Sequence, residues 1–300
     1  MLDAFLSWTM VETGIRFATP ILLAALGGYL CQRAGVFNIG LEGTMLSGAF
    51  AAVAASFATH SWALGILGGV LGGVFAAAIF ALFVVSLRTD EIVTGLTVNI
   101  LAVGMTTYLL RAVFGVQGRF ASDQIVMVPP LGLPLDWIPG IGSFLSSTSI
   151  LVYLALVAAI VINVYMRYLP GGVRLQAVGE APAALAASGL PIARTKWLAI
   201  LVSGGLCGLA GTYLTIGELG QYVDNVTAGR GYIAIAAFVF GGRGVGGVVL
   251  AAFLFGLVDS LAIRTQGLGL PSNLAFTLPY IAAIAAITVV GARSRRVSRA

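Results

Sequence analysis

Two polar residues stand out in a glycine-rich stretch of this apolar chain, R-A-G-V-F-N-I-G-L-E-G-T-M-L-S-G at Arg33–Gly48. They are Asn38 and Glu42, and a charged side chain at membrane depth costs on the order of 2.5–3.5 kcal/mol by insertion scales. A carboxylate there could relay a proton, but a relay needs an acid, a base or a histidine within reach, and none is evident. We favour a helix junction at the cytoplasmic side, in which Asn38 caps the next helix and Glu42 stabilises its first turn. Direct contact with a substrate is the alternative.

A second group of polar residues lies on one apolar segment, residues 92–116. Thr97 and Tyr108 are eleven positions apart, about three helical turns, and therefore share a face. That face could line a path for a polar solute, or its side chains could form hydrogen bonds between helices. The candidate path residues are Asn38, Glu42, Thr97, Asn99 and Tyr108.

The sequence shows no catalytic constellation. The single histidine, His60, falls at the end of an apolar segment, and Cys31 and Cys207 lack the spacing of metal ligands. The motif G-G-R-G-V-G-G at 241–247 lacks the Lys-Ser/Thr pair of a phosphate-binding loop. We therefore predict no catalytic residue, metal or cofactor on this chain, and any ATP hydrolysis must come from another chain.

Composition sets the fold class. Hydrophobic residues make up 59% of the 300 residues and charged residues only 9%, against roughly 25% charged residues in soluble domains. The apolar runs are long enough for membrane-spanning helices, which need about 20 residues each. We predict an all-α integral membrane protein, a polytopic bundle of about 8–10 spans. The predicted spans are 13–31, 39–59, 62–87, 92–116, 149–168, 197–217, a short one at 229–242, 244–263 and 273–291.

The basic residues predict the orientation of the chain. With the arginine-rich tail in the cytoplasm and nine crossings, eleven of the 16 Lys and Arg residues fall inside. The other five are Arg16, Arg111, Arg119, Arg230 and Arg264. This bias favours an outside N-terminus and a cytoplasmic C-terminus. The positive charge thus reports topology and contact with anionic lipid rather than nucleic-acid binding.

The inside loop at 169–196 contains a short predicted helix. Pro182 suits its first turn and Glu180 its N-terminal end, and Gly189 followed by Pro191 ends it. The intervening A-P-A-A-L-A-A-S is made of small residues with few charges. Such a helix must bury a face, either on its own bundle or, as we favour, in a groove of a soluble partner.

The chain also shows internal repetition, with Gly-flanked segments at 37–43 and 229–237, each followed by a Gly-Gly-headed helix. The corresponding spans run in opposite directions across the predicted membrane. We predict one transmembrane domain, 1–300, built of repeat 1 at about 13–116, a linker span at 149–168, a cytoplasmic loop at 169–196, repeat 2 at about 197–291 and a basic tail at 292–300. Inverted repeats of this kind are typical of transporters.

The stretch R-A-G-V-F-N-I-G-L-E-G-T-M-L-S-G-A-F resembles the signature of ABC importer permeases of the branched-chain amino acid, ribose and simple-sugar superfamily. The form N-I-G-L-E-G resembles the nucleoside and simple-sugar branch. Three further stretches are similar to that branch: V-G-E-A-P-A-A-L-A-A-S-G-L-P-I-A-R-T-K at 178–196, G-R-G-Y-I-A-I-A-A-F-V-F-G at 229–241 and G-L-V-D-S-L-A-I-R-T-Q at 256–266.

The resemblance implies a subunit of a bacterial-type inner-membrane importer, with a second permease subunit, two cytoplasmic ATPase subunits and an extracytoplasmic binding protein. ATP and magnesium would bind to the ATPase, and the cargo would be a nucleoside or a simple sugar. The alternatives are a branched-chain amino acid importer and an ion-coupled secondary transporter. The coupling helix would comprise Glu180, Ala181, Pro182, Ala183, Ala184, Leu185, Ala186, Ser188 and Gly189. The family often has G-x-N-P in this loop, and Ala181 here replaces the Asn.

Overall fold

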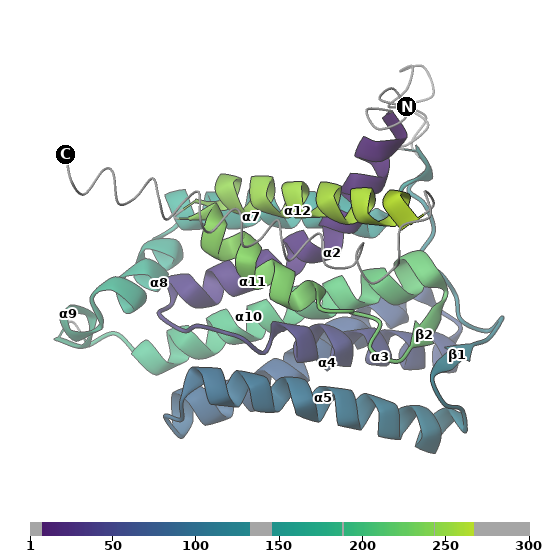
Figure 1. Ribbon diagram of the computed structural model, residues 1–300. Helices are drawn as coiled ribbons and strands as arrows, with labels where there is room; N and C mark the ends of the chain where they lie inside the picture. Colours follow the sequence, from purple (N-terminus) through teal and green to yellow (C-terminus); the bar gives the residue numbers. More distant parts are fainter. Residues whose placement is uncertain (1–7, 133–145, 188, 243, 267–300) are drawn as a thin grey trace.

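The computed structural model describes residues 8–132, 146–187, 189–242 and 244–266. Seven helices in this part are long and apolar enough to span a membrane. Figure 1 shows them as one elongated bundle of roughly aligned helices. They are α2 (Trp8–Arg33), α3 (Leu41–Thr59), α4 (Trp62–Ala81) with its π-helical extension η1 (Leu82–Ser86), α5 (Glu91–Phe114), α7 (Ile150–Tyr168), α10 (Ile192–Thr212) with the π-helical extension η2 (Tyr213–Leu219), and α12 (Val245–Gln266). The predicted all-α membrane fold is confirmed.

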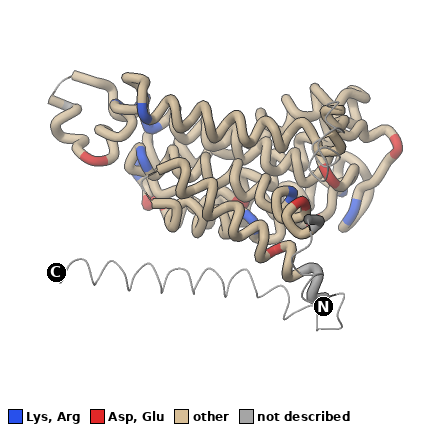
Figure 2. The backbone as a smooth tube through the Cα atoms, turned by 90° about the horizontal axis from the view of Figure 1, so that it is seen from above, with Lys and Arg blue, Asp and Glu red and all other residues tan. Residues whose placement is uncertain are grey.

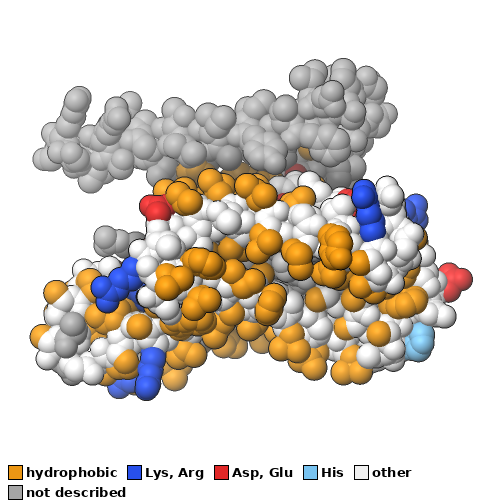
Figure 3. Space-filling model, turned by 90° about the horizontal axis from the view of Figure 1, so that it is seen from below, with side chains coloured by type: hydrophobic (Ala, Val, Ile, Leu, Met, Phe, Trp, Pro, Cys, Tyr) orange, Lys and Arg blue, Asp and Glu red, His pale blue; other side chains and the backbone are white. Residues whose placement is uncertain are grey.

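The seventh predicted span, the short one at 229–242, is a helix of only 12 residues, α11 (Arg230–Gly241). The ninth predicted span, 273–291, and the basic tail at 292–300 lie outside the described residues. Apolar side chains point outward along the long helices, including Phe75 at 69% and Ile100 at 74% exposure. Figure 3 shows apolar atoms spread over the lower face of the bundle, as expected of a surface that faces lipid or another membrane subunit.

Two antiparallel helices, α2 and α10, form the centre of the bundle. Their opposite directions follow from their ends: Arg16 of α2 pairs with Glu218 of η2, and Lys196 of α10 donates to the Gly35 carbonyl just after α2. Helix α2 packs against α11 and α12, while α10 packs against α3 and α4. Small residues allow this close approach. A Cβ on Gly73 of α4, for example, would collide with the backbone of α10 at Gly204 and Gly208.

The bundle has two distinct ends, which we call the strand end and the α9 end. The strand end carries two three-residue strands, β1 (Arg119–Ala121) and β2 (Gln221–Val223), paired antiparallel. These strands are a small departure from the all-α prediction. The loop that contains β1 is held by an aromatic contact, because Phe120 stacks on Phe114 at 4.0 Å between ring centroids. Figure 2 shows most charged residues gathered toward the two ends of the bundle.

The α9 end carries two short helices, α8 (Pro170–Glu180) and α9 (Pro182–Ala187), which project at the left of Figure 1. Pro182 begins α9 as predicted. The prediction was wrong about Glu180, which is the last residue of α8, and α8 itself was not predicted. Gly171 and Gly172 disfavour a helix by propensity. Tertiary packing overrides that preference, because Gly172 lies against the backbone of Tyr165 and Met166 of α7.

Candidate functional site

Glu42 lies where the N-termini of α3 and α11 meet inside the bundle. Its Oε1 accepts hydrogen bonds from the Thr227 hydroxyl at 2.5 Å and from the Gly229 amide at 2.8 Å. Its Oε2 accepts from the Gly231 amide at 2.6 Å. The Glu42 residue is only 5% exposed. Glu42 therefore occupies the amide donors that the first turn of a helix leaves unsatisfied.

The backbone around α11 is shaped for this contact. Gly229 precedes the helix with a left-handed φ of +82°, a conformation that glycine adopts without a Cβ penalty. A Cβ on Gly231 would lie 2.6 Å from both the Cα and the nitrogen of Glu42, so a larger residue cannot fit there. Glu42 is in the first turn of α3, as predicted, but its three partners on the second half of the chain were not predicted.

Asn99 of α5 completes this junction. Its Oδ1 accepts from the Gly43 amide at 2.8 Å, and its Nδ2 donates to the Ile39 carbonyl at 3.0 Å and to the Tyr232 hydroxyl at 3.1 Å. Asn99 is eight residues into α5, about 12 Å along its axis at 1.5 Å per residue. The junction is therefore well inside the bundle.

Asn38 does not cap α3, which corrects the prediction. The N-cap residue is Gly40, and no side chain caps the helix there. The Asn38 Oδ1 instead accepts from the Gly40 amide at 2.9 Å, two residues along the chain. This local turn is an alternative use of a short polar side chain. It shapes the connection from α2 to α3, and Asn38 is 1% exposed.

The five candidate path residues do not come together in the structure. Asn38, Glu42 and Asn99 are buried in or beside the junction. Thr97 and Tyr108 instead lie on the outer face of α5, where Tyr108 is 65% exposed and the Thr97 hydroxyl donates to the Val93 carbonyl. The candidates thus divide into a buried group and an outward-facing group.

A further charged pair joins α11 to α12. Arg230 Nε lies 3.8 Å from Asp259 Oδ2, and its guanidinium carbon is 5.9 Å from the centre of the Phe17 ring on α2. Because Arg230 is adjacent to the Glu42 contacts, this pair places charged groups of two helices beside the junction.

The predicted coupling residues lie on an exposed projection. Ala181, Pro182, Ala183 and Ala184 are exposed, and Leu185 is half-buried. Gly189 has a φ of +75°, which suits the residue that follows a helix. The side chain of Ala186 and the whole of Ser188 lie outside the described part of the chain.

The α9 projection is joined to the bundle through α8. At the end of α2, Arg33 Nη2 donates a hydrogen bond to Gln176 Oε1 at 2.9 Å. The Nη1 atom of the same guanidinium lies 3.6 Å from Glu180 Oε1. A Cβ on Gly35 would be only 2.9 Å from the Cα of Gly179, so α8 is in close contact with the turn after α2. That turn leads directly to Asn38 and Glu42, and α9 is thereby connected to the buried junction.

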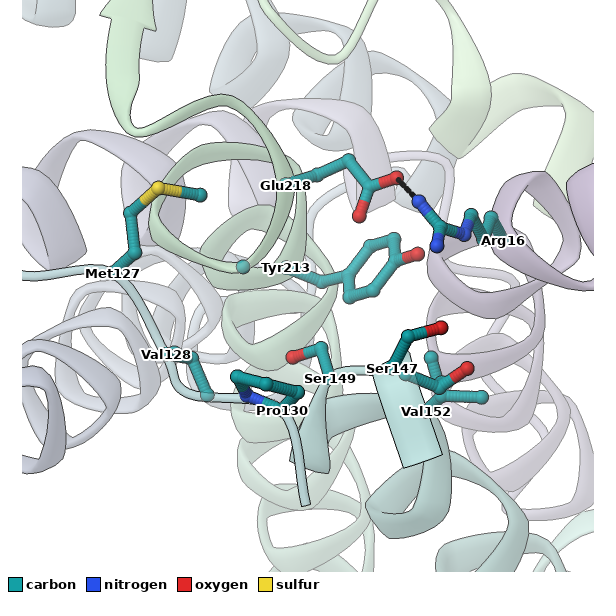
Figure 4. A pocket seen from close by; sticks show the side chains of 11 residues that line it. Arg16, Met127, Val128, Pro130, Ser147, Ser149, Val152, Tyr213 and Glu218 are labelled. Carbon is teal, nitrogen blue, oxygen red and sulfur yellow. Dashed lines mark hydrogen bonds and ion pairs between the residues drawn. The ribbon is translucent and has the colours of Figure 1, made fainter. Parts of the chain in front are cut away.

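A polar pocket of about 250 Å³ opens at the strand end, between α2, η2, the start of α7 and the loop after β1. Figure 4 shows the Arg16 and Glu218 side chains meeting above the Tyr213 ring, with their 3.4 Å contact drawn as a dashed line. The Tyr213 hydroxyl is directed toward Arg16, and Ser147 and Ser149 lie across the pocket. This pocket was not predicted, because its residues come from four separate parts of the sequence.

The π-helix η2 builds one wall of this pocket. A π-helix widens the backbone turn and occurs frequently at functional sites. The Ile216 carbonyl in η2 accepts a hydrogen bond from the Val128 amide at 2.9 Å, which ties the loop after β1 to η2. The same loop is held by Ser56 of α3, which bonds both backbone groups of Val126 at 3.0 Å. The loop that forms this side of the pocket is therefore held through hydrogen bonds to its backbone.

Comparison with known sequences identifies the family. Residues 10–290 match the family described as the permease component of the branched-chain amino acid transport system. The nucleoside ABC transporter permease protein NupC of Lactococcus lactis is 33% identical, over 91% of this chain and 89% of that protein. The guanosine ABC transporter permease protein NupQ of Bacillus subtilis is 31% identical, over 93% and 91%. A putative glucose ABC transporter permease protein of Haloferax volcanii is 33% identical, over 87% and 79%.

Solved structures show the same fold. The inward-facing conformation of a putative metal-chelate type ABC transporter superposes with a TM-score of 0.52 at 15% identity, over 95% of this chain and 88% of that one. At this identity the likeness concerns the fold alone. Together with the apolar helices and the sequence match, it shows that this multi-pass membrane protein belongs to the branched-chain amino acid transport system permease family and is a permease component of an ABC transporter.

Proposed function

We propose that the chain is the permease subunit of an ATP-driven importer that carries a nucleoside or, as second choice, a simple sugar. The named activities of the relatives support this substrate class, because two concern nucleosides and one concerns glucose. The observation that carries the coupling part of the proposal is the exposed α9 helix. Its small side chains leave an apolar surface at the end of the bundle that a partner could cover.

The proposed partners follow from this assignment. Two ATPase subunits lie on the cytoplasmic side and bind the ATP and magnesium. The α9 helix of this chain docks in a groove of the ATPase. A second, similar permease completes the membrane assembly, and an extracytoplasmic binding protein delivers the solute. Placing α9 in the cytoplasm puts the strand end and the start of α2 outside, and we propose that the C-terminus is cytoplasmic, in a bacterial-type cell membrane.

The packing of the central helices supports the two inverted repeats. The first helix of each proposed repeat, α2 or α10, packs against the second and third helices of the other repeat. Because α2 and α10 are antiparallel, the two halves have opposite directions. In the proposed alternating-access movement, closure of the ATPase pulls α9, and α8 transmits the pull to the turn at Gly35 and the Glu42 junction. The repeats then move against each other.

The test is uptake by proteoliposomes that contain the permease with its ATPase subunits, the second permease and the binding protein. We expect uptake of guanosine, uridine or glucose to require hydrolysable ATP on the ATPase side and to persist when ionophores abolish ion gradients. Uptake that continues without the ATPase subunits, or that follows an ion gradient, would contradict the proposal and favour a secondary transporter.

A variant of Gly189 tests the coupling helix itself. Gly189→Val forces a β-branched residue into a left-handed φ, which strains the backbone although a Cβ there meets no atom of the described residues within 4 Å. We expect several-fold less solute transported per ATP hydrolysed, with an unchanged melting temperature of the bundle. Gly189→Asn is the matched control, because Asn tolerates the left-handed region. Equal coupling in the two variants would count against the docked helix.

A further inference from the structure

We propose that the polar pocket at the strand end binds a neutral, hydroxyl-rich solute ring, such as a hexose or the ribose of a nucleoside. The pocket is lined by Arg16, Tyr213 and Glu218 together with the hydroxyl side chains Ser147, Thr148 and Ser149. This inference rests on the proposed import function, and it names the place where the outer end of this chain first receives the solute.

The first supporting observation is Tyr213. Its side chain is among the largest that are fully buried, at 2% exposure. Its hydroxyl interacts with the neighbouring Glu218 carboxylate but makes no hydrogen bond of normal geometry among the described residues. A buried hydroxyl without a partner costs roughly 1–3 kcal/mol by protein mutational data. The group lies at the pocket wall and points toward Arg16 (Figure 4). A solute hydroxyl can supply the partner that the protein does not.

The second observation is the ion pair above Tyr213. Arg16 and Glu218 are 42% and 35% exposed, and their single contact is 3.4 Å long. Exposed pairs of this kind are worth about 0–1 kcal/mol, so opening one costs little. The guanidinium retains donors, and the carboxylate retains acceptor positions, beyond this one contact. The pair can therefore separate and admit a solute to the Tyr213 hydroxyl.

The charge balance of the pocket favours a neutral ligand. The charges of Arg16 and Glu218 offset each other, so the site gives no net attraction to an anion or a cation. It does present a strong donor, a strong acceptor and several hydroxyl groups, and a sugar hydroxyl both donates and accepts. The volume of about 250 Å³ lies just below the 300–1,000 Å³ of sites for drug-sized ligands, which suits a single ring.

The experiment measures equilibrium binding to the complete transporter in lipid nanodiscs, without the binding protein and without ATP. The probes are radiolabelled guanosine, uridine and glucose, with ribose as competitor and leucine as the amino-acid comparison. We expect saturable binding of at least one hydroxyl-rich probe, with competition by ribose and none by leucine. Absence of saturable binding by all three probes, or equal competition by leucine, would overturn the proposal.

Variants locate the binding. We expect Tyr213→Phe to weaken it about threefold to tenfold and Glu218→Gln to weaken it by more than about tenfold, as for neutral and charged hydrogen bonds. Met127 also lines the pocket, and Met127→Trp should block binding of the probe by filling the pocket with a larger side chain. This variant changes no polar residue, so it tests the pocket even if a polar variant fails to fold. The matched controls are Tyr168→Phe, at the α9 end, and Asp123→Asn, in the loop after β1.

The outcomes separate this inference from the proposed function. Melting temperature and ATPase activity confirm that each variant is assembled. If all pocket variants bind the probe as the wild type does, the pocket assignment is wrong. ATP-dependent uptake by the same wild-type preparation would then still support the importer. Loss of ATP-dependent uptake in the wild type would refute the importer itself, whatever the pocket variants show.

Discussion

Two glutamates of the bundle, Glu42 on α3 and Glu218 on η2, have opposite environments. Glu42, at the buried junction, is 5% exposed and accepts three hydrogen bonds from the start of α11. Glu218, at the pocket, has a side chain that is 35% exposed and a single 3.4 Å contact with Arg16. The residue type is the same, but the first carboxylate is occupied by protein donors and the second retains accepting positions.

This difference distinguishes Glu42, a polar group that stabilises the fold, from Glu218, a polar group that can bind a ligand. In a low-dielectric interior, a fully satisfied polar network makes one arrangement rigid, whereas a partly satisfied one has a cost that a ligand can offset. The Glu42 and Asn99 contacts fix α3, α5 and α11 relative to one another. The Tyr213 hydroxyl and the Arg16–Glu218 pair leave capacity for a solute. The comparison predicts that substitutions at the junction mainly affect stability, and those at the pocket mainly affect binding.

The largest expected effect is that of Glu42→Ala. It leaves the Gly229 and Gly231 amides and the Thr227 hydroxyl without an acceptor, each at roughly 1–3 kcal/mol. We expect a loss of about 3–5 kcal/mol in the free energy of unfolding, or failure to assemble. The measurement is thermal or denaturant unfolding of the purified protein in mild detergent. Glu218→Ala is the matched control, and equal losses for the two variants would break the comparison.

The second prediction concerns Asn99→Ala. This change removes one acceptor and two donor contacts, to Gly43, Ile39 and Tyr232, but leaves no charge unpaired. We expect a loss of about 2–3 kcal/mol in the free energy of unfolding. Thr97→Ala, on the exposed face of the same helix, is the control and should change it by less than about 0.5 kcal/mol. If instead Asn99→Ala unfolds normally but transports poorly, Asn99 lines the path.

The sequence predicted the features that depend on neighbouring residues and on apolar character. The long apolar runs determine the helices, and Pro182 and Gly189 determine where α9 begins and where the chain turns after it. It did not predict the partners of Glu42, because Thr227 is 185 residues away and nothing local links them. The prediction for Asn38 was wrong for a local reason. A short polar side chain before a helix can either cap the helix or bond to the backbone of its own turn, and the sequence does not distinguish the two.

The pocket was harder to predict than the junction. Glu218 is recognisable as a polar residue near the end of an apolar run, but its direction depends on the π-helical turn of η2. No residue type in this stretch marks such a turn. In the sequence Tyr213 is an ordinary aromatic residue, and only the packed structure shows that its hydroxyl makes no hydrogen bond to any described residue.

A smaller effect is expected for the Arg16–Glu218 pair. A double-mutant cycle with Arg16→Gln and Glu218→Gln should give a coupling energy of about 0.2–1 kcal/mol, because both side chains are exposed. The coupling should decrease further in high salt. Denaturant unfolding of the four proteins measures it. A coupling energy as large as the stability loss expected for Glu42→Ala would mean that the Arg16–Glu218 pair is a structural contact that a solute does not separate.

The last prediction is that Tyr213→Phe leaves stability unchanged or raises it by up to about 1 kcal/mol, because the substitution removes a buried hydroxyl that makes no hydrogen bond within the described part of the chain. Its opposite at the junction is Tyr232→Phe, which removes the acceptor of an Asn99 bond and should lower stability by about 1 kcal/mol. Parallel melting curves check both. The decisive result is the combination of two measurements. Tyr213→Phe should melt no lower than the wild type and should bind the sugar ring more weakly. A hydroxyl that binds a ligand and does not stabilise the fold gives this result. A marked drop in its melting temperature would show that the hydroxyl already has a structural role.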